Sequence, residues 1–358
     1  MPALLLPVVL AGLALALAGT PAAQITLGGD GATLAVSGGL QPRAGFDRQS
    51  GAERLGFGLR RARLQARVTI GRLGAEYDAE LSTGAIQAID LFAFADVSDR
   101  VQVRAGLLAG AQPRALVPTG YPVIDVVDRA AIAERWATGT IGPLGRDFGV
   151  DAVVRGERTR LDLFVHNGSG GGFSASDNVV GIGSGALAEA DRLGLAVSAA
   201  VRHTLGGPSG VEVGAFAGVS SGNERTATAT PDGPVERSYA TGSAHVYWGA
   251  LPGSQPVRLK ADALALRYDG PAPETAAGVS LLAAVRALGH GEALARAERY
   301  WADVDASGDT YLTAGLSYSL SAARGGPYEA ARLTLAYTGR EVAGTPAHLV
   351  VLQGQFAF

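Results

Sequence analysis

Charged side chains alternate with apolar ones between residues 60 and 81, in a pattern that could handle ions. Three arginines share one face of the extended segment 60–70, and three acids share one face of the segment 73–81: Arg61, Arg63, Arg67, Glu76, Asp78 and Glu80. A two-residue turn at 71–72 would set these faces opposite each other, with Arg67 across from Glu76 and Arg63 across from Glu80. Because paired charges largely cancel, the pattern favours bracing of a wall over attraction of an anion.

A second group of arginines surrounds the predicted turn at 156–157. Its members are Arg155, Arg158 and Arg160, with Arg104, Arg192 and Arg202 as further candidates elsewhere. Asp151 and Asp162 are potential partners for these guanidinium groups. For this group, anion handling along a pore and bracing by ion pairs both stay open.

Other chemistry finds little support in the composition. The chain has no cysteine, its five histidines show no metal-ligand spacing, and no G-x-S-x-G motif occurs. No cofactor and no bound metal are therefore expected, and the protein is not expected to be an enzyme. A barrel hydrolase would need Ser, His and a carboxylate or amide on one wall, which a sequence does not exclude. The net charge of −3 argues against a nucleic-acid partner.

The elements that must position these residues are strands, since the dominant hydrophobic period is two. At the end of the chain, for example, Leu312, Ala314 and Leu316 alternate with Thr313, Gly315 and Ser317. Sixteen candidate strands follow: 33–44, 54–70, 73–83, 88–97, 100–109, 146–155, 158–166, 191–203, 210–221, 237–248, 257–268, 277–288, 293–303, 309–320, 329–339 and 346–358. We predict an all-β fold, a closed transmembrane antiparallel barrel of about sixteen strands.

A leader favours the membrane over a soluble sandwich. Residues 3–18 form an apolar stretch followed by small residues, which is typical of a secretory signal peptide cleaved near residue 23. The remaining 24–358 then form one barrel domain in the bacterial outer membrane. An arginine on the lipid face costs about 2–4 kcal/mol at the midplane, so the arginine face must look into a wet lumen.

The connections fit such a barrel, because the three longest fall on the same side, at 110–145, 167–190 and 222–236. The remaining outside connections are predicted at 45–53, 84–87, 269–276, 304–308 and 340–345. The stretch 274–304 has two interpretations, because its Ala, Leu, Arg and Glu content also suits a helical hairpin broken at Gly289 and Gly291.

Several segments resemble the phosphate-selective porin O and P family of outer-membrane channels. They are GFGLRRARLQARVTIG at 56–71, EYDAEL at 76–81, VQVRAGLL at 101–108, RDFGVDAVVRG at 146–156, LFVHNGSGGG at 163–172 and the aromatic C-terminus. The resemblance implies a sixteen-stranded barrel that forms a homotrimer, with a long third loop folded inward and arginines at its constriction. The corresponding loop, 110–145, holds three charges of each sign: Arg114, Asp125, Asp128, Arg129, Glu134 and Arg135.

The sequence departs from that family in the features behind phosphate selectivity. The chain has one lysine, Lys260, where the family has a lysine-rich funnel, and residues 106–109 replace its Gly-Gln-Phe-Lys-like stretch. We therefore predict a porin in contact with outer-membrane lipid that passes small hydrophilic solutes, with at most weak preference for anions such as phosphate. The alternatives are a non-conducting barrel that scaffolds the membrane or binds a partner, and the barrel hydrolase.

Overall fold

The structure, a computed structural model, describes residues 25–29, 31–82, 84–116, 123–141, 145–168, 195–207, 210–230, 233–270, 273–287 and 289–357. The side chains of residues 25–26 and 222–237 are not part of this description. Four features predicted above lie wholly or mostly outside the described residues: the signal peptide at 1–23, the connection at 167–190, the candidate Arg192 and the terminal Phe358.

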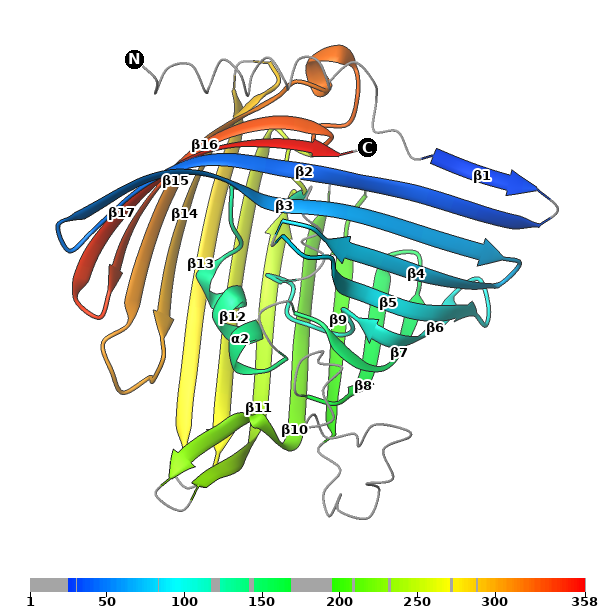
Figure 1. Cartoon of the computed structure of the whole chain (residues 1–358), viewed down its shortest axis with the longest axis horizontal. Helices are drawn as coiled ribbons and strands as arrows, with labels where there is room; N and C mark the ends of the chain where they lie inside the picture. Colours follow the sequence, from blue (N-terminus) through cyan, green and yellow to red (C-terminus); the bar gives the residue numbers. More distant parts are fainter. Residues whose placement is uncertain are drawn as a thin grey trace.

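Sixteen antiparallel strands close into a barrel (Figure 1). Each pairs with its neighbours in chain order, and the last strand returns to pair with β2. In chain order they are β2 (Ala32–Gln49), β3 (Ala52–Ile70), β4 (Leu73–Glu80), β5 (Gln87–Asp96), β6 (Val101–Leu108), β7 (Asp147–Arg155), β8 (Thr159–His166), β9 (Ala196–Leu205), β10 (Val211–Thr230), β11 (Gly233–Trp248), β12 (Val257–Asp269), β13 (Glu274–Ala287), β14 (Gly291–Trp301), β15 (Asp309–Ser319), β16 (Ala331–Val342) and β17 (Thr345–Ala357). The predicted all-β barrel is therefore confirmed.

The alternation of side chains along the strands gives the wall an apolar outer face and a polar inner face. Leu281, Leu312 and Leu316 are among the many large apolar residues exposed on the outer face, whereas polar residues such as Gln102, Ser280 and Thr334 are buried. A soluble sheet would bury the apolar face and expose the polar one. This wall does the reverse, as a barrel in lipid around a polar interior requires.

Tight turns set the register of the hairpins. β3 and β4 join through Gly71 and Arg72, with a φ of 57° at Gly71, so Ile70 pairs with Leu73 as predicted. β2 and β3 join through Ser50 and Gly51, both in the left-handed region. The connections predicted at 45–53 and 222–236 are wrong in length, because both hairpins continue as paired strand, to Gln49 and Ala52 in the first and to Thr230 and Gly233 in the second.

Residues 274–304 contain two strands, which excludes the helical hairpin. β13 and β14 pair directly from Ala277 and Trp301 to Ala287 and Gly291. Burial along β13 alternates almost residue by residue. Within a sheet this period of two outweighs the local helix propensity of Ala, Leu and Glu.

A short strand that was not predicted completes the edge of β2. β1 (Ile25–Gly29) pairs with residues 32–36 of β2, whereas β17 pairs with residues 39–49 of the same strand. β1 therefore continues the line of β17 along β2 (Figure 1). Its five residues, two of them glycine, offer too little alternation to be recognised in the sequence.

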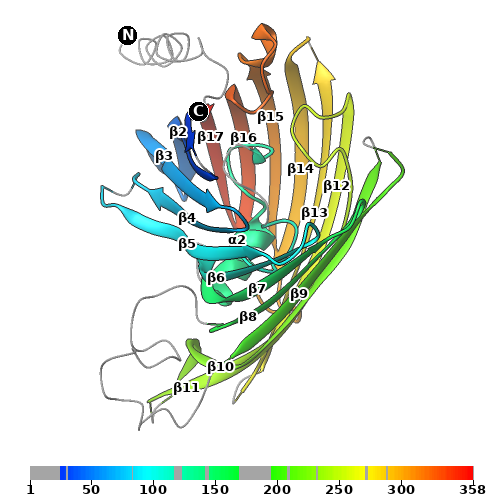
Figure 2. The same ribbon diagram turned by 90° about the vertical axis from the view of Figure 1, so that its right-hand side faces the viewer.

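The connection between β6 and β7 turns into the barrel, where it carries the helix α2 (Ala131–Gly139) (Figure 2). Ile132, Trp136 and Ile141 of this connection pack against the inner wall residues Phe216 and Leu264. The helix was not predicted. A second short helix, η2 (Ala322–Arg324), lies between β15 and β16. No helix among the described residues is long and apolar enough to cross a membrane.

Candidate pore and constriction loop

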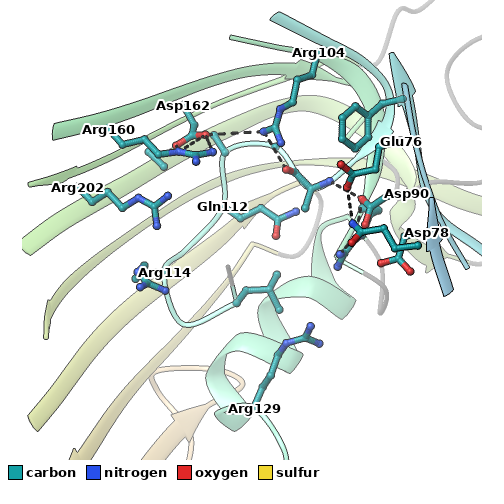
Figure 3. A pocket seen from close by; sticks show the side chains of 18 of the residues that line it. Glu76, Asp78, Asp90, Arg104, Gln112, Arg114, Arg129, Arg160, Asp162 and Arg202 are labelled. Carbon is teal, nitrogen blue, oxygen red and sulfur yellow. Dashed lines mark hydrogen bonds and ion pairs between the residues drawn. The ribbon is translucent and has the colours of Figure 1, made fainter. Parts of the chain in front are cut away.

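A cavity of about 520 Å³ lies inside the barrel between the inward loop and the wall from β3 to β11. Seven arginines and four carboxylates line it: Arg63, Arg104, Arg114, Arg129, Arg146, Arg160, Arg202, Glu76, Asp78, Asp90 and Asp162. Figure 3 shows the carboxylates of β4 and β5 on one side, with Arg114, Arg160 and Arg202 on the other. The lining therefore has three more guanidinium groups than carboxylates.

The predicted ladder between β3 and β4 is present, and its charges are paired. Arg67 lies 2.7 Å from Glu76, and Arg63 lies 3.2 Å from Glu80, at the register positions predicted from the sequence. Gln65, which faces Asp78 in the register, instead donates to Glu76 at 2.8 Å. The pairs join neighbouring strands, which is the bracing arrangement.

A β-bulge changes the neighbourhood of Arg61. The pairing of β2 with β3 shifts between Gln41 and Pro42, opposite Leu59 and Arg61. Arg61 is buried and donates to the side chain of Gln41, and the adjacent Arg60 also turns inward, to Asp128 of the loop at 2.8 Å. Strict alternation would have placed Arg60 on the lipid face, so a bulge hid this contact from sequence reasoning.

The second arginine group divides into three environments. Arg104 pairs with Asp151, and Arg160 donates to Asp162 from Nε and Nη2, the two nitrogens of one guanidinium edge, at 2.6–3.0 Å. Arg155 donates to Gln102 at 3.0 Å. Arg158 is exposed at the turn before β8 and is not part of the cavity lining. Arg104 and Arg160 thus reach the cavity, and Arg155 and Arg158 do not.

Carboxylates of the inward loop bind cations on two parts of the barrel wall, β12 and β3. Asp125 accepts hydrogen bonds from Arg258 at 2.6 Å and Lys260 at 2.8 Å, and Asp128 accepts one from Arg60. Burial acts to raise the pKa of Asp125, but Lys260 and Arg258 outweigh it and lower this pKa to about 2. The pKa of Asp128 is lowered in the same way, against burial, chiefly by Arg60. Both loop carboxylates therefore stay charged and bound at neutral pH.

Backbone groups hold the rest of the loop. Glu298 accepts a hydrogen bond from the N–H of Ala131 at the start of α2, which suits the positive end of a helix dipole. Arg332 donates to the carbonyl of Ile124, and Tyr268 donates to the carbonyl of Gly139 at 2.7 Å. The loop is thus fixed at both ends of the helix.

The other loop candidates have distinct positions. Arg114 reaches the cavity and pairs with Glu212 of β10, and Arg129 reaches it beside Glu134. Burial lowers the pKa of Arg129 to about 10. Arg135 points away from the cavity toward Asp309, at 3.8 Å. Of the six predicted loop residues, two therefore line the cavity.

Sequence reasoning missed several interior residues. Asp90 and Arg146 pair at 3.0 Å beside the cavity, and Arg258 forms a buried pair with Glu292 at 2.7 Å. Arg296 pairs with Glu298 at 2.7 Å. All but Arg146 stand on inward positions of strands, so the alternation that located the first ladder could also have located them.

A Ser–His–Asp chain also occurs in the wall. His166 lies 2.7 Å from Asp147 and 2.9 Å from the hydroxyl of Ser198, and its ring stacks on Phe164. Ser198 is only 4% exposed and is not among the cavity-lining residues. A nucleophile needs an approach path for its substrate, so this chain is a hydrogen-bonded brace between β7, β8 and β9. No cluster of His, Asp or Glu suited to a metal ion occurs in the described residues.

Solved structures share this architecture. The anion-selective porin from Comamonas acidovorans matches with a TM-score of 0.65 at 14% identity, over 91% of this chain and 100% of that one. The trimer form of the outer membrane protein OmpT of Vibrio cholerae matches with a TM-score of 0.60 at 12% identity, over 92% and 100%. The outer membrane channel DcaP of Acinetobacter baumannii matches with a TM-score of 0.59 at 13% identity, over 92% and 98%.

These matches define the fold as that of the bacterial porins, the sixteen-stranded barrel predicted from the sequence. No family model and no curated protein sequence matches the chain.

Proposed function

We propose that the protein is an outer-membrane porin through which small hydrophilic solutes diffuse passively. The observation that carries the proposal is a charged cavity inside a closed barrel whose outer face is apolar. Exported chains with this build span the outer membrane, which supports the predicted signal peptide at 1–23 and the outer-membrane location. A trimer is supported by the family resemblance and by the trimer form of the Vibrio cholerae protein.

We further propose that the pore prefers anions weakly. More guanidinium groups than carboxylates face the solute in the cavity lining. Carboxylates outside the lining neutralise four of these arginines, which keeps the preference weak. Lys260, the one lysine, binds Asp125 of the loop and contributes no free charge to the pore. Phosphate is therefore one of several small anions the pore passes, without the strong selectivity of the porin O and P family.

Conductance in planar bilayers tests the proposal. The refolded full chain, added to a bilayer at neutral pH, should give discrete current steps, and a KCl gradient should give a reversal potential of the sign that anion preference requires. Silence from correctly folded protein would instead support the scaffold alternative, and strong cation preference would refute the anion preference.

The hydrolase alternative has one specific candidate, the Ser198 chain. A fluorophosphonate probe labels a serine only when it is activated and accessible, so the folded protein should remain unlabelled. Labelling that is lost in Ser198→Ala would assign an enzymatic activity to this wall.

A further inference from the structure

We propose that the cavity holds a subsite for dipolar solutes, with the carboxylate of an amino acid on Arg202 and its ammonium group on Asp78. The proposal rests on the pore function above and names the solute class that the pore favours. Its basis is an arginine without an ion pair and a carboxylate with one unsatisfied oxygen, on opposite sides of one cavity.

Arg202 is the cavity arginine without an ion pair. Each of the other six lies within 4 Å of a carboxylate, for example Arg114 beside Glu212 and Arg146 beside Asp90. Arg202 makes no hydrogen bond or ion pair with any residue that the structure describes. Its guanidinium donors are therefore available to a solute.

The register of the wall explains why Arg202 is left over. Arg202 on β9 lies directly across from Arg160 on β8, and like charges in such a position repel. Asp162 accepts hydrogen bonds from Nε and Nη2 of Arg160 and pairs only with that member of the two arginines. On its other side Arg202 faces Gly214 of β10, which brings no side chain. An anion beside Arg202 would neutralise the remaining positive charge.

Asp78 is in the corresponding situation with a negative charge. It lies on β4 directly across from Asp90 on β5, and Asp90 pairs with Arg146 at 3.0 Å. Asp78 is 8% exposed, and its Oδ1 atom accepts no hydrogen bond from any described residue. The nearest cation, Arg63, lies 3.9 Å from Oδ2, beyond hydrogen-bond distance. A buried carboxylate oxygen without a donor is costly, and an ammonium group would supply one.

The two groups share one space. Arg202 and Asp78 both line the cavity, and Figure 3 shows them on opposite sides of it, with Gln112 of the loop between them. An anion alone would pair with Arg202 and leave Asp78 without a donor. A cation alone would pair with Asp78 and leave Arg202 without an acceptor. A solute with a carboxylate at one end and an ammonium group at the other satisfies both and brings no net charge into the pore.

Swelling of proteoliposomes made with the full chain tests the subsite. The probes are 4-aminobutanoate and 6-aminohexanoate, each compared with the neutral hydroxy amide of the same length. Both solutes of a pair have the same length and no net charge. The ratio of their entry rates therefore does not depend on the size of the pore. We expect the amino acid to enter several-fold faster than its neutral counterpart, with the better of the two lengths reporting the span from Arg202 to Asp78.

Variants and current blockade separate the outcomes. In Arg202→Gln and Asp78→Asn the ratio should fall toward one, and the blockade of single-channel current by the better amino acid should weaken about tenfold, as for one charge-assisted hydrogen bond. The controls Arg72→Gln and Asp99→Asn remove an exposed ion pair outside the cavity and should keep the wild-type ratio.

Current steps without any preference for the amino acids in the wild type would overturn the subsite and leave the porin proposal intact. Equal blockade by butanoate and 4-aminobutanoate would also overturn it, in favour of a plain anion site. An absence of current steps would defeat both proposals.

Discussion

The barrel has two walls that use arginine for opposite purposes. On the wall from β4 to β9, arginines such as Arg104 and Arg160 pair with acids of the same or the adjacent strand, and the cavity stays open beside them. On the wall from β12 to β17, Arg258 and Arg332 reach instead to the inward loop and are almost completely buried. An interior charge can act on a solute only where the loop does not cover it.

Among the changes that test this comparison, the largest effect is expected at Arg258. Its side chain is 0% exposed and bridges Asp125 of the loop and Glu292 of the wall. Arg258→Gln leaves Glu292 buried without its cation, so we expect a loss of about 3–5 kcal/mol in the free energy of unfolding, measured by urea denaturation in detergent. The loop should also detach, which larger and noisier current steps would show.

A matched variant at the surface controls for loss of charge alone. Arg340 pairs with Asp47 at 3.4 Å, with both side chains about 30% exposed. Arg340→Gln should change the free energy of unfolding by at most about 1 kcal/mol and leave the conductance unchanged. Equal effects of the two variants would show that burial against the loop does not distinguish the walls.

The apolar contact of α2 should be the next most important. Trp136 is buried, packs edge-on against Phe216 at 5.4 Å and donates its indole N–H to Thr241 at 3.0 Å. Trp136→Ala removes these contacts, so we expect the docked loop to lose about 3 kcal/mol, with faster proteolysis at 131–139 and increased current noise. Thr138→Ala is the control, because Thr138 is exposed and its hydroxyl donates within the helix to the carbonyl of Glu134. Equal proteolysis of the two variants would contradict the docking.

The ion pairs of the first wall could be predicted from the sequence, because they join residues that are close together in the chain. Arg67 and Glu76 are nine residues apart, and one turn at Gly71 fixes their register. A period of two therefore sufficed to predict the strands, the closed barrel and the ladder between β3 and β4. The same period located Arg104 and Arg160 on the inner face, although it could not show that Arg155 and Arg158 do not reach the cavity.

The contacts of the second wall could not be predicted in this way, because they join residues that are far apart in the sequence. Asp125 meets Arg258 across 133 residues of sequence, and its position depends on how a loop folds inside a closed barrel. The sequence of α2 has no side-chain cap at its N-terminus, so its start carries no local signature, and Glu298 from β14 supplies the missing acceptor. Tertiary contacts, and not local propensity, determine this half of the site.

Protonation of Asp125 gives a smaller, pH-dependent test of the loop attachment. Its pKa is lowered from 3.8 to about 2 in the folded protein, so its contribution is complete above about pH 4 and is lost as the pH falls toward 2. The shift corresponds to about 2 kcal/mol. We expect constant conductance from pH 7 to 4 and loop release only below about pH 3. Asp125→Asn should lack this transition, and a wild-type transition near pH 5 would contradict the assignment.

The smallest effect should come from the exposed arginine of the first wall. Arg160 is 31% exposed and lines the cavity, whereas Arg158, two residues earlier, is exposed at the turn and does not line it. Removing the charge of Arg160 leaves Asp162 to offset the remaining arginines, so Arg160→Gln should shift the reversal potential under a KCl gradient toward cations. Arg158→Gln should leave it unchanged. Equal shifts would mean that the outer surface potential sets selectivity, and a shift in neither would assign Arg160 to bracing alone, which would make the two walls alike in function.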